Sequence, residues 1–202
     1  AFEVVTGKNL GEEKLLAYAY EIEGHADNVT PSAVGSLVLT CTTEDGRVKY
    51  IQGEWPRELK IVAAVPSLQL STETARDVLP EAIPLKDVTF NLQRAALFWP
   101  ALIGRRFELV REAMRDRVHQ PYRQSLVPGL SEALQIRDLD GLVSIALSGA
   151  GPTVMALASS NFQKIAEELV TCLGRAGVVA RSLILDVDRE GRTVSRQDIK
   201  DA

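Results

Sequence analysis

The sequence predicts an α+β fold, in which helices back an antiparallel sheet. The last third supplies the first observation, because a strand, a Gly-rich turn, a second strand, an amphipathic helix and a third strand follow one another there. The second observation is that helical and strand periods alternate through the rest of the chain, without a repeat or a low-complexity linker. A chain of 202 residues is long enough for one large or two small domains.

The first third predicts a helix, a loop, a hairpin and a further strand. Apolar residues recur at helical spacing over 10–23, and Gly24 follows as a helix-ending residue, since this position commonly needs φ > 0. After the loop, strands over 33–43 and 48–51 flank the turn "EDGR" and predict a hairpin. The compact apolar run over 59–66 has the length of a strand.

The remaining two thirds predict mainly helices, followed by strands. Ser71 or Thr72 can cap a short helix, and 87–103 has a helical pattern in which Pro100 marks a kink or a break. Further elements are a helix over 106–116, strands over 143–147 and 154–158, a helix over 161–174 and a strand over 181–188.

Composition excludes several classes of partner. A net charge of −4 gives no indication of a nucleic-acid or membrane-surface partner, so local cations must attract any anionic substrate. Cys41 and Cys172 lie far apart in the sequence and are predicted to be buried free thiols. No apolar run approaches the roughly 20 residues of a membrane span, and no signal peptide opens the chain, so a cytoplasmic protein is predicted.

Two short stretches carry candidate chemistry. In "LSGAGPT", Ser148, Gly149, Ala150 and Gly151 join two apolar strands, and such small residues leave backbone amides free to form an anion-binding nest. The alternative is an ordinary turn without a ligand.

The second stretch is "EIEGHADN", which crowds Glu21, Glu23, His25, Asp27 and Asn28 between a helix and a strand. Together these residues supply hard oxygen ligands and several hydrogen-bonding groups at a predicted loop. The alternative is an Asx-type turn beside a solvated histidine. That reading accounts for any one of these residues, but not for all of them together.

Several segments resemble one kinase family. "EGHADNVTPSAVG" resembles the E-G-H-x-D-N-V-x-P segment of homoserine kinases, and "LSGAGPT" resembles the C-terminal glycine motif of the wider GHMP family of small-molecule kinases. Between them, "LSTETARDVLP" is similar to the family's substrate-side segment, "FNLQRAALFWPAL" to its Asn-Leu-x-Arg-Ala helix, and "RDRVHQPYRQSLVPG" to its Pro-x-Arg segment. The similarity covers nearly the whole chain.

The resemblance implies a two-lobe fold in which ATP and substrate meet in a cleft. Residues 1–54 would be the remainder of an N-terminal lobe, and 55–202 a ferredoxin-like C-terminal lobe. The reaction implied is transfer of the γ-phosphate of ATP, with Mg²⁺, to the hydroxyl of L-homoserine, which gives O-phospho-L-homoserine for threonine synthesis. No membrane partner is implied, and a homodimer is the default symmetric assembly.

The resemblance also assigns roles to residues. Homoserine is a zwitterion, so Arg76 and Arg123 would bind its carboxylate, because a guanidinium matches a carboxylate bidentately. Asp27 would bind the ammonium group and has a possible catalytic role. The remaining implied substrate contacts come from His25, Asn28, Thr72 and Gly151.

The metal ligand and the base stay open at this point. Glu21 and Glu23 both precede the histidine as candidates for Mg²⁺, and of the two Glu21 is preferred. A strong base is not required, because positioning and charge neutralisation can dominate a loose phosphoryl-transfer transition state. Asp27 is therefore first a substrate-positioning residue, and His25 is the weaker candidate for a base.

One part of the family pattern is absent from the sequence. The Pro-x-x-x-G-L-G-S-S-A phosphate loop is not found, and Phe2, Val4 and Val5 resemble the end of a helix that began earlier. The chain is therefore expected to be an inactive fragment with exposed apolar surface. Two alternatives remain, namely another GHMP kinase acting on mevalonate or a related small alcohol, and a non-catalytic amino-acid-binding fragment.

Overall fold

The computed structural model describes residues 2–193, and they confirm the α+β class. The chain divides into two compact units, Ala1–Trp55 with Val187–Ala202, and Pro56–Asp186. Of the first unit, the structure describes 2–55 and 187–193. The units are defined by packing, so the assignment of 1–54 and 55–202 to two family lobes stays a prediction.

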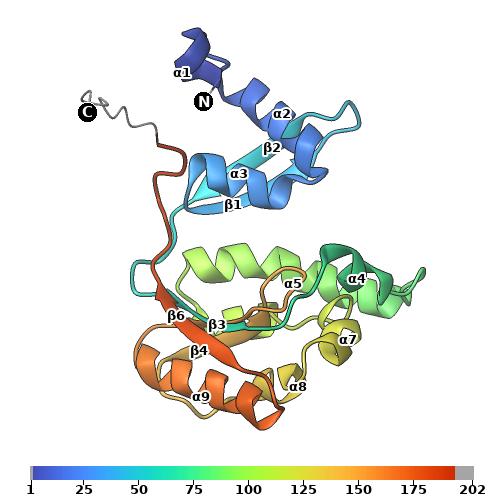
Figure 1. Cartoon of the computed structure of the whole chain (residues 1–202), viewed down its shortest axis with the longest axis vertical. Helices are drawn as coiled ribbons and strands as arrows, with labels where there is room; N and C mark the ends of the chain where they lie inside the picture. Colours follow the sequence, from blue (N-terminus) through green and yellow to red (C-terminus); the bar gives the residue numbers. More distant parts are fainter. Residues whose placement is uncertain (1, 194–202) are drawn as a thin grey trace, which may run out of the picture. The chain divides into compact units, whose positions relative to one another are not determined.

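The first unit packs helices against a two-stranded hairpin (Figure 1). Its helices are α1 (Phe2–Thr6), α2 (Glu12–Glu23) and α3 (Ala26–Val34), and its strands are β1 (Leu37–Thr42) and β2 (Val48–Gly53). The strands pair antiparallel from Leu37 opposite Gly53 to Thr42 opposite Val48, which confirms the predicted hairpin. Both α2 and α3 contact this hairpin.

Helix α3 corrects the prediction of a loop before β1. It begins after His25, whose extended backbone (φ −151°, ψ 151°) caps the helix, and Pro31 lies inside it. Asp, Asn, Ser and Pro favour turns in isolation, but here packing against α2 and β1 overrides these local preferences. Ser32 hydrogen-bonds within the helix, since its Oγ donates to the carbonyl of Asn28 at 2.8 Å. The strand consequently begins at Leu37 and not at residue 33.

The segment after the last strand returns to the first unit. The N–H of Ser36 donates to the carbonyl of Asp188 at 2.6 Å. A Cβ on Gly35 would lie 2.6 Å from the backbone nitrogen of Gly191, so this approach requires glycine at both positions. The predicted strand over 181–188 therefore ends early, at Leu185, and the following residues join α3 and β1 instead.

The second unit holds a four-stranded antiparallel sheet. Its strands are β3 (Lys60–Pro66), β4 (Leu142–Leu147), β5 (Val154–Ala158) and β6 (Ala180–Leu185), in the spatial order β4-β5-β3-β6. All three neighbouring pairs are antiparallel. The first and third strands in sequence lie at the centre, which is the ferredoxin-like order. The predicted antiparallel sheet is confirmed.

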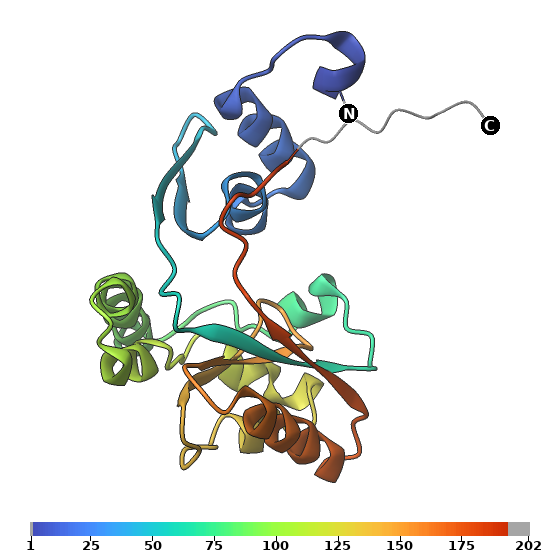
Figure 2. The same ribbon diagram turned by 90° about the vertical axis from the view of Figure 1, so that its left-hand side faces the viewer.

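Helices cover both faces of this sheet (Figures 1 and 2). On one face lie α9 (Phe162–Arg175) and α8 (Leu130–Ala133), and on the other lie α5 (Leu85–Ile103) and α6 (Phe107–Ala113). Pro100 does not break α5, which continues to Ile103. The main core lies between α9 and the sheet, and its fully buried side chains include Val62, Val154, Ile165, Leu169 and Leu173. The remaining helical segments are α4 (Thr72–Asp77), α7 (Gln120–Arg123) and a 3₁₀ turn (Gln124–Leu126).

Two further findings concern the cysteines and the membrane. Cys172 is buried, and burial raises the pKa of its thiol. The prediction of burial was wrong for Cys41, because alternation along β1 places this residue on the exposed face of the hairpin. Both thiols are free.

No helix in the described part of the chain is long and apolar enough to cross a membrane.

Candidate substrate and phosphate site

The predicted site residues fall into two groups, one in each unit. In the first unit they lie where α2 ends and α3 begins. Gly24 ends α2 in the left-handed conformation (φ 80°), and its N–H donates to the carbonyl of Tyr20 at 2.8 Å. This turn brings the last turn of α2, with Glu23, beside the first turn of α3, with Asp27.

His25 lies between two carboxylates. Its Nε2 is 3.6 Å from Oε1 of Glu23, and its Nδ1 is 2.6 Å from Oδ1 of Asp27. Nδ1 and Asp27 are within ion-pair range but lack hydrogen-bond geometry, so Nδ1 is a buried nitrogen without a hydrogen-bond partner among the described residues. The structure therefore brings together three of the five predicted groups, Glu23, His25 and Asp27.

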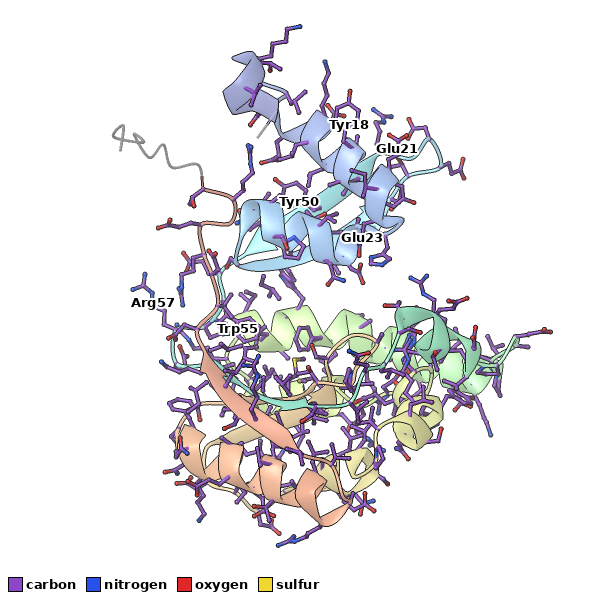
Figure 3. All side chains as sticks on the ribbon, in the orientation of Figure 1. Tyr18, Glu21, Glu23, Tyr50, Trp55 and Arg57 are labelled. Atoms are coloured by element: carbon purple, nitrogen blue, oxygen red, sulfur yellow. The ribbon has the colours of Figure 1, made fainter. Side chains whose placement is uncertain are left out.

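The two candidate glutamates differ in surroundings. Glu21 and Glu23 both lie on the last turn of α2 (Figure 3), but residues two apart on a helix face different directions. Only Glu23 reaches His25, while Glu21 is exposed and makes no hydrogen bond or ion pair with described residues. The geometry favours Glu23 over Glu21 as the acidic residue of this group.

A second polar atom in this unit is buried without a partner. Thr30 of α3 is fully buried, and its Oγ1 makes no hydrogen bond to any described residue. A buried hydroxyl without a partner costs about 1–3 kcal/mol. Oγ1 of Thr30 and Nδ1 of His25 are thus two buried polar atoms without a hydrogen-bond partner on or beside α3.

The acidic residues can be tested against the Mg²⁺ that the family implies. The described residues contain no cluster of three or more Asp, Glu, His or Cys side chains that could hold a metal. Such a cage is not needed for Mg²⁺ in kinases, which usually takes one or two protein carboxylates together with substrate phosphates. Glu23 and Asp27, on either side of His25, fit that requirement.

In the second unit, Thr72 and Arg76 lie on α4. Ser71 caps this helix, since its Oγ accepts the N–H of Thr74 at 3.0 Å, so of the two predicted caps Ser71 is the one used. Thr72 is left in the first turn with its side chain exposed. Arg76 is also exposed, and it pairs with no carboxylate in the described part of the chain. It is therefore a free cation on α4.

Arg123 is the most unusual charge in the described structure. Only 8% of it is exposed. Its Nε donates to the carbonyl of Ala75 at 3.0 Å, and its Nη1 to the carbonyl of Gly149 at 3.1 Å. No carboxylate between residues 2 and 193 forms an ion pair with it. A buried guanidinium with only carbonyl partners keeps its charge uncompensated, and it lies between α4 and the glycine turn.

The glycine turn leaves two amides free. Ser148 and Gly151 use their N–H groups within the turn, on the carbonyls of Thr153 and Ser148. The N–H groups of Gly149 and Ala150 find no acceptor among the described residues. Gly149 has φ 56°, and a Cβ there would meet nothing within 4 Å, so the turn is open at this point. Two successive free amides are the donors of an anion-binding nest.

Sequence analysis missed the residues that hold Arg123. Oδ1 and Oδ2 of Asp116 accept hydrogen bonds from Asn91 and from the backbone immediately before α7. Burial alone would raise the pKa of Asp116, but these hydrogen bonds lower it below its usual range. The available signal was an Asp shortly before Pro121, since Pro is common in the first turn of a helix.

The chain is similar to known proteins of one family of small-molecule kinases. The family described as GHMP kinases C terminal matches residues 98–175, which include Arg123 and the glycine turn. The homoserine kinase of Aquifex aeolicus is 42% identical over 177 residues, which are 87% of this chain and 59% of that protein. The homoserine kinase of Persephonella marina is 40% identical over 187 residues, or 93% of this chain and 62% of that protein. The chain therefore matches the GHMP kinase family over residues 98–175, and most of its length is similar to homoserine kinases.

A solved structure shows the fold of the chain. The crystal structure of homoserine kinase from Cytophaga hutchinsonii matches 95% of this chain and 62% of its own, with a TM-score of 0.82 and 23% identity. This match shows the fold alone. The chain thus spans only about 60% of the length of the proteins that it matches. The homodimer stays a prediction.

Proposed function

We propose that the whole protein transfers the γ-phosphate of ATP to the hydroxyl of L-homoserine, giving O-phospho-L-homoserine. The observation that carries this proposal is the buried, acid-free guanidinium of Arg123 beside the glycine turn. An uncompensated buried charge is costly, and a carboxylate that accepts from the remaining N–H groups of Arg123 would offset that cost. An amino-acid substrate supplies such a carboxylate, whereas a neutral alcohol does not.

The other groups complete the recognition of a zwitterion. Arg76, exposed and without an acidic partner in the described chain, is the second cation for the carboxylate. Asp27 is the acceptor for the ammonium group, and its carboxylate is largely exposed beside His25. Asn28 and His25 orient the hydroxyl that receives the phosphate, and Thr72 supports the carboxylate side. Mevalonate also carries a carboxylate but has no ammonium group, so Asp27 is the residue that separates the two substrates.

Other groups would bind the phosphates of ATP and the metal ion. The free N–H groups of Gly149 and Ala150 can donate to phosphate oxygens, and Gly151 leaves the backbone accessible. Glu23, next to His25, is the carboxylate for Mg²⁺, and Glu21 is the second choice. The metal would neutralise charge on the phosphates of ATP, while the residues named here bind and orient the substrate. No strong base is invoked, and Asp27 acts by positioning.

The deciding experiment measures ADP release from ATP and Mg²⁺ with L-homoserine or with mevalonate. It compares this chain with an N-terminally extended form that carries the part of the relatives that the chain does not match. We expect turnover of homoserine by the extended form and little or none by the chain alone, which lacks the predicted phosphate loop. Turnover of mevalonate, with homoserine ignored, would overturn the assignment of Arg123, Arg76 and Asp27.

A binding measurement on the chain alone separates catalysis from recognition. If homoserine stabilises the chain against thermal unfolding without ADP release, the chain binds the amino acid but does not catalyse. A ligand at about 100 times its Kd adds about 2.7 kcal/mol to the folded state, so the shift is measurable. D-homoserine is the matched control, because it carries the same charges with the opposite handedness.

A further inference from the structure

We propose that Asp116 is a positioning residue that holds α7, and through it Arg123 and the glycine turn, in the arrangement that the substrate site needs. The kinetic part of this inference rests on the proposed function, but the structural part does not. Asp116 lies in the segment "RDRVHQPYRQSLVPG" that resembles the family's Pro-x-Arg segment, but the resemblance assigned a role only to Arg123 there. Its role follows from the hydrogen bonds that it accepts and from what the next helix carries.

Four hydrogen bonds converge on the carboxylate of Asp116. Its Oδ1 accepts from Nδ2 of Asn91 at 2.5 Å and from the N–H of Val118 at 2.9 Å. Its Oδ2 accepts from the N–H of His119 at 2.8 Å and of Gln120 at 2.5 Å. Three successive backbone amides are therefore turned toward one side chain. Both oxygens are used twice, and the start of α7 has one defined position.

Asn91 ties this cluster to the middle of α5. While its Nδ2 donates to Asp116, its Oδ1 accepts the N–H of Arg117 at 2.9 Å. The side-chain amide of Asn91 thus hydrogen-bonds to the side chain of Asp116 and to the backbone of the next residue, Arg117. Because α5 spans Leu85–Ile103 and packs along α6, the loop before α7 is fixed to a long, packed helix and not only to itself.

From α7, two side chains reach outward to the candidate site. Oε1 of Gln120 accepts the N–H of Leu147 at 2.8 Å, at the last residue of β4 before the glycine turn. Arg123, at the other end of α7, donates to Ala75 of α4 and to Gly149 of the turn. The carboxylate of Asp116 therefore positions α7, and α7 contacts both α4 and the glycine turn. A displacement of α7 would move Arg123 and loosen the turn together.

The chemistry requires a carboxylate at position 116. All four partners are donors, so the side chain must only accept. In Asp116→Asn, an amide NH₂ group replaces one carboxylate oxygen. This change removes the acceptor of two of the four hydrogen bonds and places two N–H donors against other donors. The change preserves size, so its effects report the hydrogen bonds and not a cavity.

The first test observes Arg123 directly in the chain as it exists. The Nε–H of Arg123 is buried and hydrogen-bonded, so its proton should exchange slowly with water in a ¹⁵N NMR spectrum. In Asp116→Asn, we expect this exchange to be at least about tenfold faster, because α7 is no longer held. The matched control is Asp138→Asn, an exposed aspartate without a partner in the described chain. Unchanged exchange in Asp116→Asn would overturn the proposal.

The second test measures kinetics in the N-terminally extended form. Asp116→Asn should raise KM for homoserine at least tenfold and leave KM for ATP within about twofold, because the cation for the substrate carboxylate is displaced. A purely structural role would instead lower kcat for every substrate as the active fraction falls. An equal rise of KM for homoserine and for ATP would contradict a positioning role of Asp116.

A second variant covers the case in which Asp116→Asn does not fold. Asn91→Ala removes one of the four hydrogen bonds to Asp116 and the hydrogen bond from the N–H of Arg117, but it keeps the carboxylate, so a smaller change in the same direction is expected. If Asn91→Ala leaves both Arg123 exchange and KM for homoserine unchanged, the proposal fails. If the wild-type extended form ignores homoserine, the proposed function fails, while the exchange of Arg123 still decides the role of Asp116.

Discussion

The two units differ sharply in how much apolar surface they bury. In the second unit, Val154, Leu169 and Leu173 are fully buried between α9 and the sheet. In the first unit, Leu39 and Ile51 are paired across the hairpin and remain 58% and 64% exposed. Since buried apolar area is the main favourable contribution to folding, the second unit is expected to carry most of the stability of the chain.

The predicted site residues are distributed over both units. The second unit holds the predicted cations on α4 and α7 and the free amides on the glycine turn, where Arg123 is held by buried hydrogen bonds. The first unit supplies the carboxylates, on the ends of two helices with few buried contacts.

The largest expected effect tests the difference in burial with the same substitution in both units. Leu169→Ala, in the core beneath α9, should destabilise the chain by about 2–5 kcal/mol. Leu39→Ala, on the exposed face of β1, should change stability by no more than about 0.5 kcal/mol. Urea unfolding of both variants measures this. Equal losses would mean that Leu39 is covered in solution by a surface that the chain alone does not supply.

The next effect concerns the buried charge of the second unit. In the extended form, Arg123→Ala should raise KM for homoserine about tenfold to a hundredfold, since hydrogen bonds to charged groups contribute about 1.5–3 kcal/mol and 1.4 kcal/mol corresponds to about a factor of ten. KM for ATP should stay nearly unchanged. Arg181→Ala is the control, because Arg181 is an exposed arginine of the same unit. Unchanged homoserine kinetics would remove Arg123 from the site.

The success of sequence-based prediction also differs between the units. Helix α9 begins and ends within one residue of its prediction, because Ile165, Leu169 and Leu173 recur on one face. Helix α3 was missed, because Pro31 and its polar neighbours favour a turn and only tertiary packing decides otherwise.

The residues of the candidate site were likewise predictable from local sequence only in part. Motif resemblance singled out Arg123, but its burial and its lack of an acidic partner depend on contacts with Ala75 and Gly149, 48 and 26 residues away. The role of Asp116 depends on Asn91, 25 residues earlier, at a spacing that has no local signature. Local periodicity therefore predicted the elements, whereas the side chains that position the site arise from long-range contacts.

A smaller effect tests how the returning segment holds the first unit together. Gly35→Ala should destabilise this unit, because its Cβ would lie 2.6–2.8 Å from backbone atoms of residues 189 and 191. Gly46→Ala has nearly the same φ (79° against 77°) but its Cβ would meet nothing within 4 Å, so it reports the strain of a positive φ alone, about 1–2 kcal/mol. Hydrogen exchange of β1 and of 187–193 measures both. Equal exchange in the two variants would show that this contact contributes nothing to the unit.

The smallest effect is the pH dependence of the hairpin in the first unit. Hydrogen bonds to Asp45 from Arg47 and Thr43 lower the pKa of its carboxyl from 3.8 to about 2. Because the folded-state pKa is below the unfolded value, the stabilisation is complete above about pH 4 and is lost as the pH falls toward 2. NMR shifts of β1 and β2 should follow this titration, and Asp45→Asn should remove it. Since Asp45 is fully exposed, high salt should weaken the dependence, whereas a salt-independent titration would point to a buried carboxyl elsewhere.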